Sequence, residues 1–362
     1  MKTKRTKKQT DPLSPIMPFL EDPTNTEILI NGHENFQIVH QGLLTDVPSP
    51  FKTEAQLMEL IQAIAEPLGR YADESHPILD LRLQDGSRVH AVIPPISLNG
   101  PVVTIRKATI GSMTAEQLVE LGVCSQEMID FLQACVTARL NILVAGGTNS
   151  GKTTVLSIIA NMIQDDERII LLQREEILLK KRRLLKLETR PANIEGRGEI
   201  TMRQLVESAV NLRAERIVTQ ELTGPETLDI LQVMNSGHDG CIQGIHATST
   251  FDALVRLEEM VSYANPSLPT LSVRNLIASA LDLIVYVERL RSGQRRITKI
   301  TEVTGLSDSV VTLRDIFQFR QLDVKNGQIE GDFPATGNIP NFMHHMQDAG
   351  IELPLSIFTP KK

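Results

Sequence analysis

The fold of this chain is decided by residues 141–162, Asn141-Ile-Leu-Val-Ala-Gly-Gly-Thr-Asn-Ser-Gly-Lys-Thr-Thr-Val-Leu-Ser-Ile-Ile-Ala-Asn-Met162. The apolar start of this stretch predicts a buried strand, and its apolar end predicts a buried helix. Between them, residues 146–153 match the phosphate-binding loop G-x-x-x-x-G-K-[ST] at every fixed position. A strand, a glycine-rich turn and a helix N-terminus form an anion site, because free backbone N–H groups and the helix dipole both favour negative charge.

The loop motif assigns roles to individual side chains. Lys152 is expected to reach the outer phosphates of a nucleotide, and Thr153 to hold Mg²⁺. An ordinary glycine-rich turn before a buried helix would require neither residue. The predicted nucleotide-binding residues are therefore Gly146, Gly147, Thr148, Asn149, Ser150, Gly151, Lys152, Thr153 and Thr154.

Composition narrows the class of protein. A length of 362 residues suggests two domains. The net charge of −7, the absence of Trp and an aromatic content of 4% argue against a nucleic-acid-binding surface. Three scattered cysteines give neither a disulfide framework nor a metal spacing, which fits a reducing compartment. No apolar run reaches transmembrane length.

Patterning divides the chain into five segments. Residues 1–11 form a basic flexible tail, which is either solvated or weakly attracted to an anionic membrane surface. Short alternating strands and one amphipathic helix predict an N-terminal α+β domain, and a hinge precedes the long α/β domain. The boundaries are 12–107 for the N-terminal domain, 108–113 for the linker, 114–305 for the α/β domain and 306–362 for a less regular C-terminal extension.

The α/β domain is predicted to contain a mostly parallel sheet, because strands and helices alternate from residue 141 onward. Capping boxes at Thr114/Gln117 and Thr201/Gln204 predict two helix starts. Glu221 and His246 end two predicted strands, at 216–221 and 241–246. Ligands of such sheets bind at the carboxyl ends of the strands, so these residues and the phosphate loop are expected at one edge.

Further motifs give the chain a family resemblance over nearly its whole length from Pro12 onward. These include Asp22-Pro-Thr-Asn-Thr-Glu-Ile28, Thr104-Ile-Arg-Lys107, Leu187-Glu-Thr-Arg-Pro191, Gly198-Glu-Ile-Thr-Met-Arg203 and Asn235-Ser-Gly-His-Asp-Gly240. In these motifs the chain resembles the hexameric motor ATPases of type II and type IV secretion and type IV pilus assembly. Within that group it is most similar to the Flp/Tad pilus assembly ATPases (CpaF-like).

The resemblance implies a RecA-like P-loop ATPase domain with a smaller PAS-like N-terminal domain. It implies a homo-hexamer that uses ATP and Mg²⁺ to drive an inner-membrane platform protein of a pilus or secretion system. Such a motor would be cytoplasmic and peripheral at the inner face of the cytoplasmic membrane, with no nucleic-acid partner.

The implied catalytic residues are Lys152, Glu221, His246, Arg88 and Arg106. Glu221 would hold Mg²⁺ through water, beside Thr153. Arg88 and Arg106 match arginines that approach the phosphates, although from the residues alone each is an exposed strand arginine. His246 matches a nucleotide-sensing histidine, whereas His238 is expected to be structural, and the two form no recognisable zinc site.

The chain departs from the family pattern in two acidic motifs. Gln173 and Arg174 occupy the positions of the usual Glu and Asp after a strand, and an amide cannot accept a proton from water. Glu175 or Glu176 would replace the acid after a local shift, or they are a solvated pair. Gln220 and Thr223 replace a Gly and an Arg around Glu221.

These departures leave two hypotheses of function. The first is an active motor whose ATPase activity is reduced by Gln173 and Arg174. The second is a nucleotide-binding structural or regulatory subunit that hydrolyses ATP poorly. A nucleic-acid translocase shares the same core, but the acidic composition disfavours it. The basic run Lys180-Lys-Arg-Arg183 is expected to be a solvated hairpin or a contact for an anionic partner.

Overall fold

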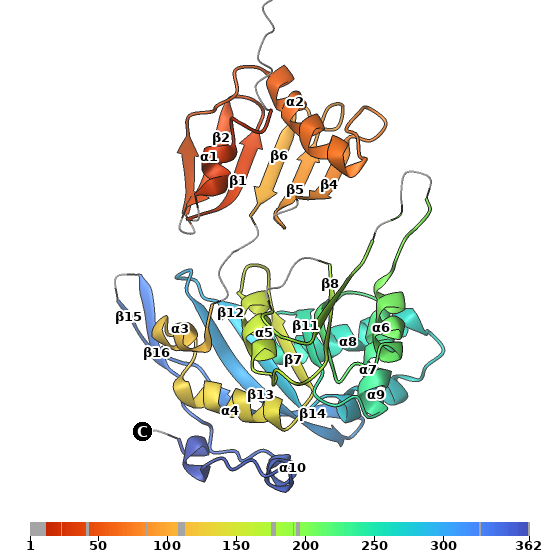
Figure 1. The fold of residues 1–362 in the computed structure, drawn as a ribbon. Coiled ribbons are helices and arrows are strands. Elements are labelled where there is room, and N and C mark those ends of the chain that lie inside the picture. Colours follow the sequence, from red (N-terminus) through yellow and green to blue (C-terminus); the bar gives the residue numbers. More distant parts are fainter. Residues whose placement is uncertain are drawn as a thin grey trace, which may run out of the picture. The chain divides into compact units, whose positions relative to one another are not determined.

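The structure is a computed structural model that describes residues 12–22, 24–40, 43–83, 86–107, 113–174, 179–190, 192, 196–325 and 327–360. The chain divides into two compact units, Met1–Gly111 and Ser112–Lys362 (Figure 1). The predicted basic tail at 1–11 and nearly all of the predicted linker lie outside the described residues. Within the described ranges, every helix is too short or too polar to cross a membrane.

The first unit is built on an antiparallel sheet with strand order β3-β2-β1-β6-β5-β4. Its strands alternate between buried and exposed side chains, so one face packs against α2 around Ile28, Ile30 and Leu57. The elements are α1 (Met17–Glu21), β1 (Asn25–Asn31), β2 (Asn35–His40), β3 (Leu43–Val47), α2 (Glu54–Ala65), η1 (Glu66–Leu68), β4 (Ile78–Arg82), β5 (Arg88–Val92) and β6 (Val102–Arg106). The short exposed edge strand β3 was not predicted.

The second unit contains an eight-stranded sheet of order β14-β13-β12-β7-β11-β10-β8-β9. From β12 to β9 all neighbours are parallel, whereas β13 and β14 are antiparallel additions. The strands are β7 (Ile142–Gly146), β8 (Ile169–Gln173), β9 (Leu184–Glu188), β10 (Arg216–Leu222), β11 (Ile242–His246), β12 (Leu283–Arg289), β13 (Arg295–Ser307) and β14 (Val310–Gln318). The prediction of a mostly parallel sheet is confirmed.

Helices cover both faces of this sheet, as the alternation along β7 shows. Ile142 and Val144 join the core under α4 and α5, while Leu143 and Ala145 join the core under α6 to α9 (Figure 1). Both predicted capping boxes are present, at the starts of α3 and α6. The helices are α3 (Ala115–Glu120), α4 (Gln126–Thr137), α5 (Lys152–Asn161), α6 (Met202–Asn211), α7 (Glu226–Asn235), α8 (Thr250–Ala264) and α9 (Thr270–Ala280).

A buried ion pair at the amino end of this sheet connects the start of β10 with three neighbouring segments. Arg216, 1% exposed, starts β10 and donates its Nε and one terminal nitrogen to the Glu167 carboxylate at 2.7 and 3.0 Å. It also donates to the carbonyls of Val136 and Gly240. A Cβ added to Gly240 would lie 1.7 Å from the Arg216 guanidinium, so this site excludes any side chain. Gly240, the second glycine of the Gly-His-Asp-Gly motif, therefore has a packing role.

The C-terminal residues differ from the predicted extension, because they continue the core of the second unit. The predicted boundary at 305/306 falls inside β13. Phe317 and Phe358 pack on Phe131 of α4, with ring centroids 5.5 and 5.8 Å away. The sequence here lacks the strand–helix alternation of the preceding domain, which is why its regular structure was missed. It contains β15 (Arg320–Lys325), β16 (Gln328–Asp332), α10 (Met343–Asp348) and η2 (Leu355–Phe358).

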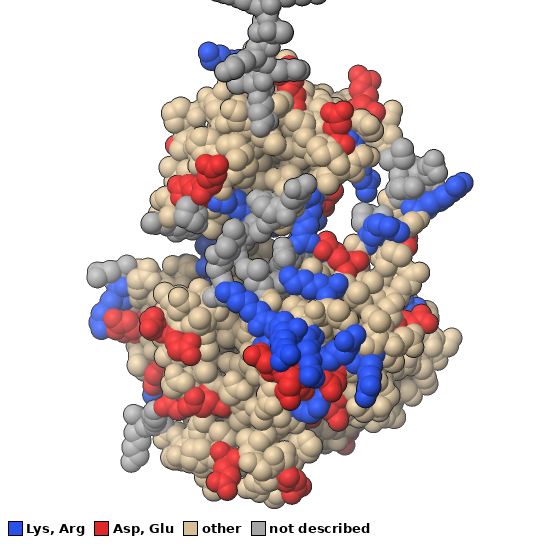
Figure 2. All heavy atoms as spheres, in the orientation of Figure 1, with Lys and Arg blue, Asp and Glu red and all other residues tan. Residues whose placement is uncertain are grey.

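The basic run at residues 180–183 lies in the turn before β9. Lys181 pairs with Asp165 at 2.9 Å, and Arg183 donates to the carbonyl of Asp166. Figure 2 shows Lys and Arg side chains on one face of the second unit with Asp and Glu side chains among them. This part of the surface therefore carries both signs of charge.

Candidate functional site

The phosphate loop joins the carboxyl end of the buried strand β7 to the start of α5. Gly151 has φ +94° and precedes the first helical residue, Lys152; a glycine adopts this left-handed conformation at no steric cost. No side chain caps the described start of α5, so the first-turn N–H groups remain available to an anion. Ser150 lies within the loop, and its buried hydroxyl has no partner among the described residues.

Lys152 reaches across the carboxyl edge of the sheet to Glu221. Its Nζ lies 2.5 Å from Glu221 Oε1, and the two side chains are 9% and 34% exposed. The lysine comes from the end of the phosphate loop and the carboxylate from near the end of β10. The structure thus brings together two residues that are 69 positions apart in the sequence.

The groups near Lys152 fit a magnesium ion better than a zinc ion. Thr153 and Glu221 offer hard oxygen ligands, and Mg²⁺ keeps several waters and commonly binds substrate phosphates. In the described ranges no group of three or more His, Cys, Asp or Glu side chains is arranged to hold a metal. The oxygen donors fit a magnesium ion that is held jointly with phosphate oxygens.

The two histidines lie at opposite ends of β11. His246 ends the strand in register with Gly146, and Ala247 donates its N–H to the Gly146 carbonyl at 3.3 Å. His238 precedes the strand, in the turn after α7, and its backbone N–H bonds to Val233. Only His246 is therefore beside the phosphate loop.

The altered acidic motif forms a connected polar network at the ends of β8 and β9. Gln173 is 3% exposed, stands in register with Glu188, and its Nε2 lies 3.4 Å from a Glu188 carboxylate oxygen. The backbone N–H of Arg174 donates to the side chain of Gln220 at 3.0 Å. Glu175 and Glu176 lie outside the described residues.

Glu226 is a buried carboxylate that sequence reasoning missed. Its side chain is 3% exposed and accepts the N–H groups of Thr223 and Gly224 at 2.9 and 3.1 Å. The Arg174 guanidinium lies 3.8 Å from it. Glu226 holds the turn that follows Glu221 in place. The available signal was an acid after Pro225 in the first turn of α7, a position that the helix dipole favours.

Arg88 and Arg106 are cross-strand neighbours at one end of the first unit's sheet. Arg88 donates to both carboxylate oxygens of Asp80, at 2.8 and 2.5 Å, which raises the pKa of the guanidinium and lowers the pKa of Asp80. Arg106 lies 3.6 Å from Glu27. Both arginines are exposed. Their cross-strand pairing places them side by side within the first unit.

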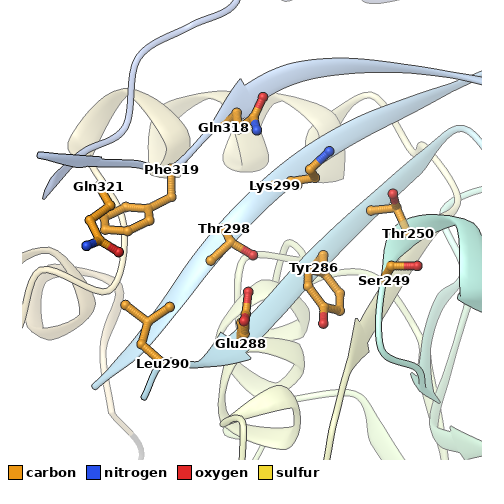
Figure 3. A pocket seen from close by; sticks show the side chains of 10 residues that line it. All are labelled: Ser249, Thr250, Tyr286, Glu288, Leu290, Thr298, Lys299, Gln318, Phe319 and Gln321. Carbon is orange, nitrogen blue, oxygen red and sulfur yellow. The ribbon is translucent and has the colours of Figure 1, made fainter. Parts of the chain in front are cut away.

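A hollow of about 300 Å³ lies against β12, β13 and β14 of the second unit (Figure 3). Tyr286, Glu288 and Phe319 line it, together with the start of α8. The Thr298 hydroxyl, which also lines the hollow, has no partner in the described part of the chain. None of the predicted site residues lines this hollow.

A parallel sheet with a phosphate loop at the carboxyl end of one strand, joined to a smaller α+β unit, defines a P-loop protein with a RecA-like domain. The family model described as type II/IV secretion system protein matches residues 9–315. The chain belongs to that family.

Individual comparisons agree with this assignment. The conjugal transfer protein TrbB of Rhizobium radiobacter is 30% identical, covering 79% of this chain and 86% of its own. The type IV secretion system protein VirB11 of Bartonella henselae is 28% identical, covering 80% and 91%. The structure of the ATPase DotB from Legionella pneumophila matches with a TM-score of 0.58 at 16% identity over 84% of each chain, which shows the shared fold.

Proposed function

We propose that this protein is a P-loop ATPase that powers a secretion or pilus-assembly machine. The observation that carries the proposal is the phosphate loop whose Lys152 meets Glu221 at the carboxyl edge of the sheet. A lysine, open helix N–H groups and a carboxylate beside them are the parts that P-loop enzymes use for phosphoryl transfer. Family membership supports the same reaction class.

Each residue has a chemical task in this proposal. The N–H groups at the start of α5 and Lys152 bind the phosphates of ATP, and Lys152 leaves Glu221 for the outer phosphates. Thr153 and Glu221 hold the magnesium ion, which neutralises phosphate charge when it is bound. His246 reports the state of the loop through its position beside Gly146. The family resemblance also assigns Arg88 and Arg106 to the phosphates; within the first unit they pair with Asp80 and Glu27.

The assembly and its cellular setting are also proposals. We infer a homo-hexamer that acts peripherally at the inner face of the cytoplasmic membrane, against a membrane platform protein. A Flp/Tad-type pilus as the driven structure rests on the sequence resemblance. The relatives TrbB and VirB11 are described as conjugal transfer and type IV secretion proteins.

Nucleotide titration tests the proposal. We expect a fluorescent ATP analogue to bind with Mg²⁺, and Lys152→Ala to weaken binding on the order of 100-fold, because it removes the charge that contacts the phosphates. Lys180→Ala, which removes an exposed lysine in the turn before β9, is the matched control and should bind as wild type does. Equal affinity of the wild-type and Lys152→Ala proteins would refute nucleotide binding at the loop.

A nucleotide-binding subunit with poor hydrolysis is the second candidate, and buried Gln173 favours it. An amide in place of the usual acid orients water but accepts no proton. Restoring the acid by Gln173→Glu should raise ATP turnover roughly 100-fold if the missing base limits the rate. The new carboxylate would adjoin Glu188, so its pKa should be raised by the like charge. Unchanged turnover would show that Gln173 does not limit hydrolysis.

A further inference from the structure

The hairpin between β12 and β13 leaves the sheet beside the phosphate loop. β12 pairs with β7 in register, with Val287 opposite Gly146 at the start of the loop. A Cβ on Gly146 would lie only 2.5 Å from the Val287 carbonyl, so the two backbones are in close contact. β13 returns from this point, and its first residue is Arg295.

Arg295 is fixed against the loop by its own side chain. Its Nε donates to the backbone carbonyl of Asn149 at 3.1 Å, across 146 positions of sequence. Its Cδ would lie 3.1 Å from a Cβ added to Gly151, so the aliphatic stem packs against the loop backbone. Nε is thus engaged at the loop, while the side chain as a whole is exposed.

Arg289 stands directly opposite Arg295 in the β12–β13 ladder. Like charges in this position destabilise a sheet. The arginine pair of the first unit, Arg88 and Arg106, is compensated by Asp80 and Glu27. In the part of the chain that the structure describes, no carboxylate pairs with Arg289 or Arg295. This uncompensated charge beside an anion-binding loop points to a ligand.

The sheet order indicates which part of a nucleotide would reach Arg295. β12 lies on one side of β7, and β11 and β10 lie on the other. Lys152, the residue expected to reach the outer phosphates, extends to Glu221 on β10. The outer phosphates therefore belong on the β10 side. The nucleoside end of the same molecule is left on the β12 side, where Arg295 lies.

We propose that Arg295 binds the nucleoside of ATP, with its planar guanidinium stacked on the purine base. The inference rests on the proposed binding of ATP at the phosphate loop. Arginine stacks on aromatic faces through its delocalised plane, which lysine lacks. Stacking does not read the edge of the base, so adenine and guanine are held alike. Arg289 adds positive charge on the same side of the loop.

The experiment compares ATP, GTP and inorganic tripolyphosphate by calorimetric titration of the full chain with Mg²⁺. Tripolyphosphate carries the phosphates without a nucleoside. We expect Arg295→Ala to weaken ATP and GTP alike, by roughly 3- to 30-fold, and to leave tripolyphosphate affinity unchanged. Unchanged tripolyphosphate binding also shows that the loop remains folded. Arg295→Lys should behave like Arg295→Ala, because it keeps the charge and loses the plane.

The matched control is Arg291→Ala, an exposed arginine in the turn of the same hairpin, which should leave all three affinities unchanged. Wild-type affinity for ATP in Arg295→Ala would overturn the nucleoside contact and leave ATP binding intact. An equal loss of ATP and tripolyphosphate would also overturn it, because the arginine would then act on the phosphates or the loop. A wild-type protein that binds no ATP would overturn this inference and the proposed function together.

Discussion

Two ion pairs lie near opposite ends of β10, and they are built differently. At the amino end, Arg216 and Glu167 have side chains that are 1% and 14% exposed, and they share two hydrogen bonds. At the carboxyl end, Lys152 and Glu221 are 9% and 34% exposed and share one contact. Arg216 also donates to two backbone carbonyls, so its guanidinium has more fixed acceptors than the single carboxylate oxygen that Lys152 contacts.

The difference separates a structural pair from one that a ligand can replace. A planar guanidinium with several fixed acceptors is held in one geometry, and removing a partner leaves a buried charge. A lysine ammonium is a compact charge on a flexible stem, so it can exchange a carboxylate for a phosphate. The same strand thus carries a fixed connection at one end and an exchangeable one at the other.

The largest expected effect on folding is at the amino end. Glu167→Gln should lower the free energy of unfolding by about 3–5 kcal/mol, because Arg216 is left as an unpaired buried charge. Denaturant unfolding monitored by circular dichroism measures it. Asp165→Asn, which removes the 74%-exposed carboxylate that pairs with Lys181, is the control and should cost less than about 1 kcal/mol. Equal effects of the two variants would show that the buried Arg216–Glu167 pair contributes no more to stability than the Lys181–Asp165 pair.

At the carboxyl end the effect should appear in turnover. Glu221→Gln should reduce ATP hydrolysis by about 100- to 1000-fold, a size typical for the loss of one electrostatic group. Its free energy of unfolding should change by less than about 1 kcal/mol, because Glu221 is 34% exposed and the flexible stem of Lys152 can turn its ammonium group toward water when the carboxylate is removed. Steady-state phosphate release and denaturant unfolding of the same preparation give both values. A stability loss as large as that of Glu167→Gln would contradict an exchangeable pair.

The smallest expected effect is a pH dependence of stability. Burial raises the pKa of Glu167, but the hydrogen bonds and charge of Arg216, together with Arg139, outweigh burial and lower it. A carboxyl group with a lowered folded pKa stabilises the protein above its unfolded pKa, and this contribution is lost as pH falls through the folded pKa. The free energy of unfolding should therefore decrease as the pH falls below about 4.3, the ordinary pKa of a Glu side chain. Acid titration of Glu167→Gln should lack this component, and an identical acid dependence in both proteins would contradict it.

Local patterns predicted the parts of this molecule that neighbouring residues determine. The phosphate loop, both capping boxes and the strands that carry Glu221 and His246 at or near their carboxyl ends follow from motifs within a few residues. The contact between Arg295 and Asn149 depends on the register of a hairpin beside β7, which no local pattern contains. The buried role of Glu226 depends likewise on the turn that folds back over it. The C-terminal strands were missed because their pairings are antiparallel, β14 with β13 and β15 with β16, and the sequence there lacks the strand–helix alternation of the preceding domain.

The contacts of the altered acidic motif could not be predicted from the family pattern. The sequence identified Gln173 and Arg174 as departures, and the structure adds that Gln220 and Glu226 contact Arg174. The departures at positions 174 and 220 are therefore coupled, because the Gln220 side chain accepts the Arg174 backbone N–H. A glycine at position 220 would leave that group without this acceptor.

Steady-state phosphate release with Mg²⁺ and ATP tests the central claim most directly, with Lys152→Ala purified in parallel. The account predicts turnover by the wild-type protein that is lost in the variant. The reason is that the ammonium group of Lys152, which contacts Glu221 in this structure, binds the phosphates of ATP when the nucleotide is present. Wild-type turnover that persists undiminished in Lys152→Ala would contradict it, since hydrolysis would then not depend on the phosphate loop.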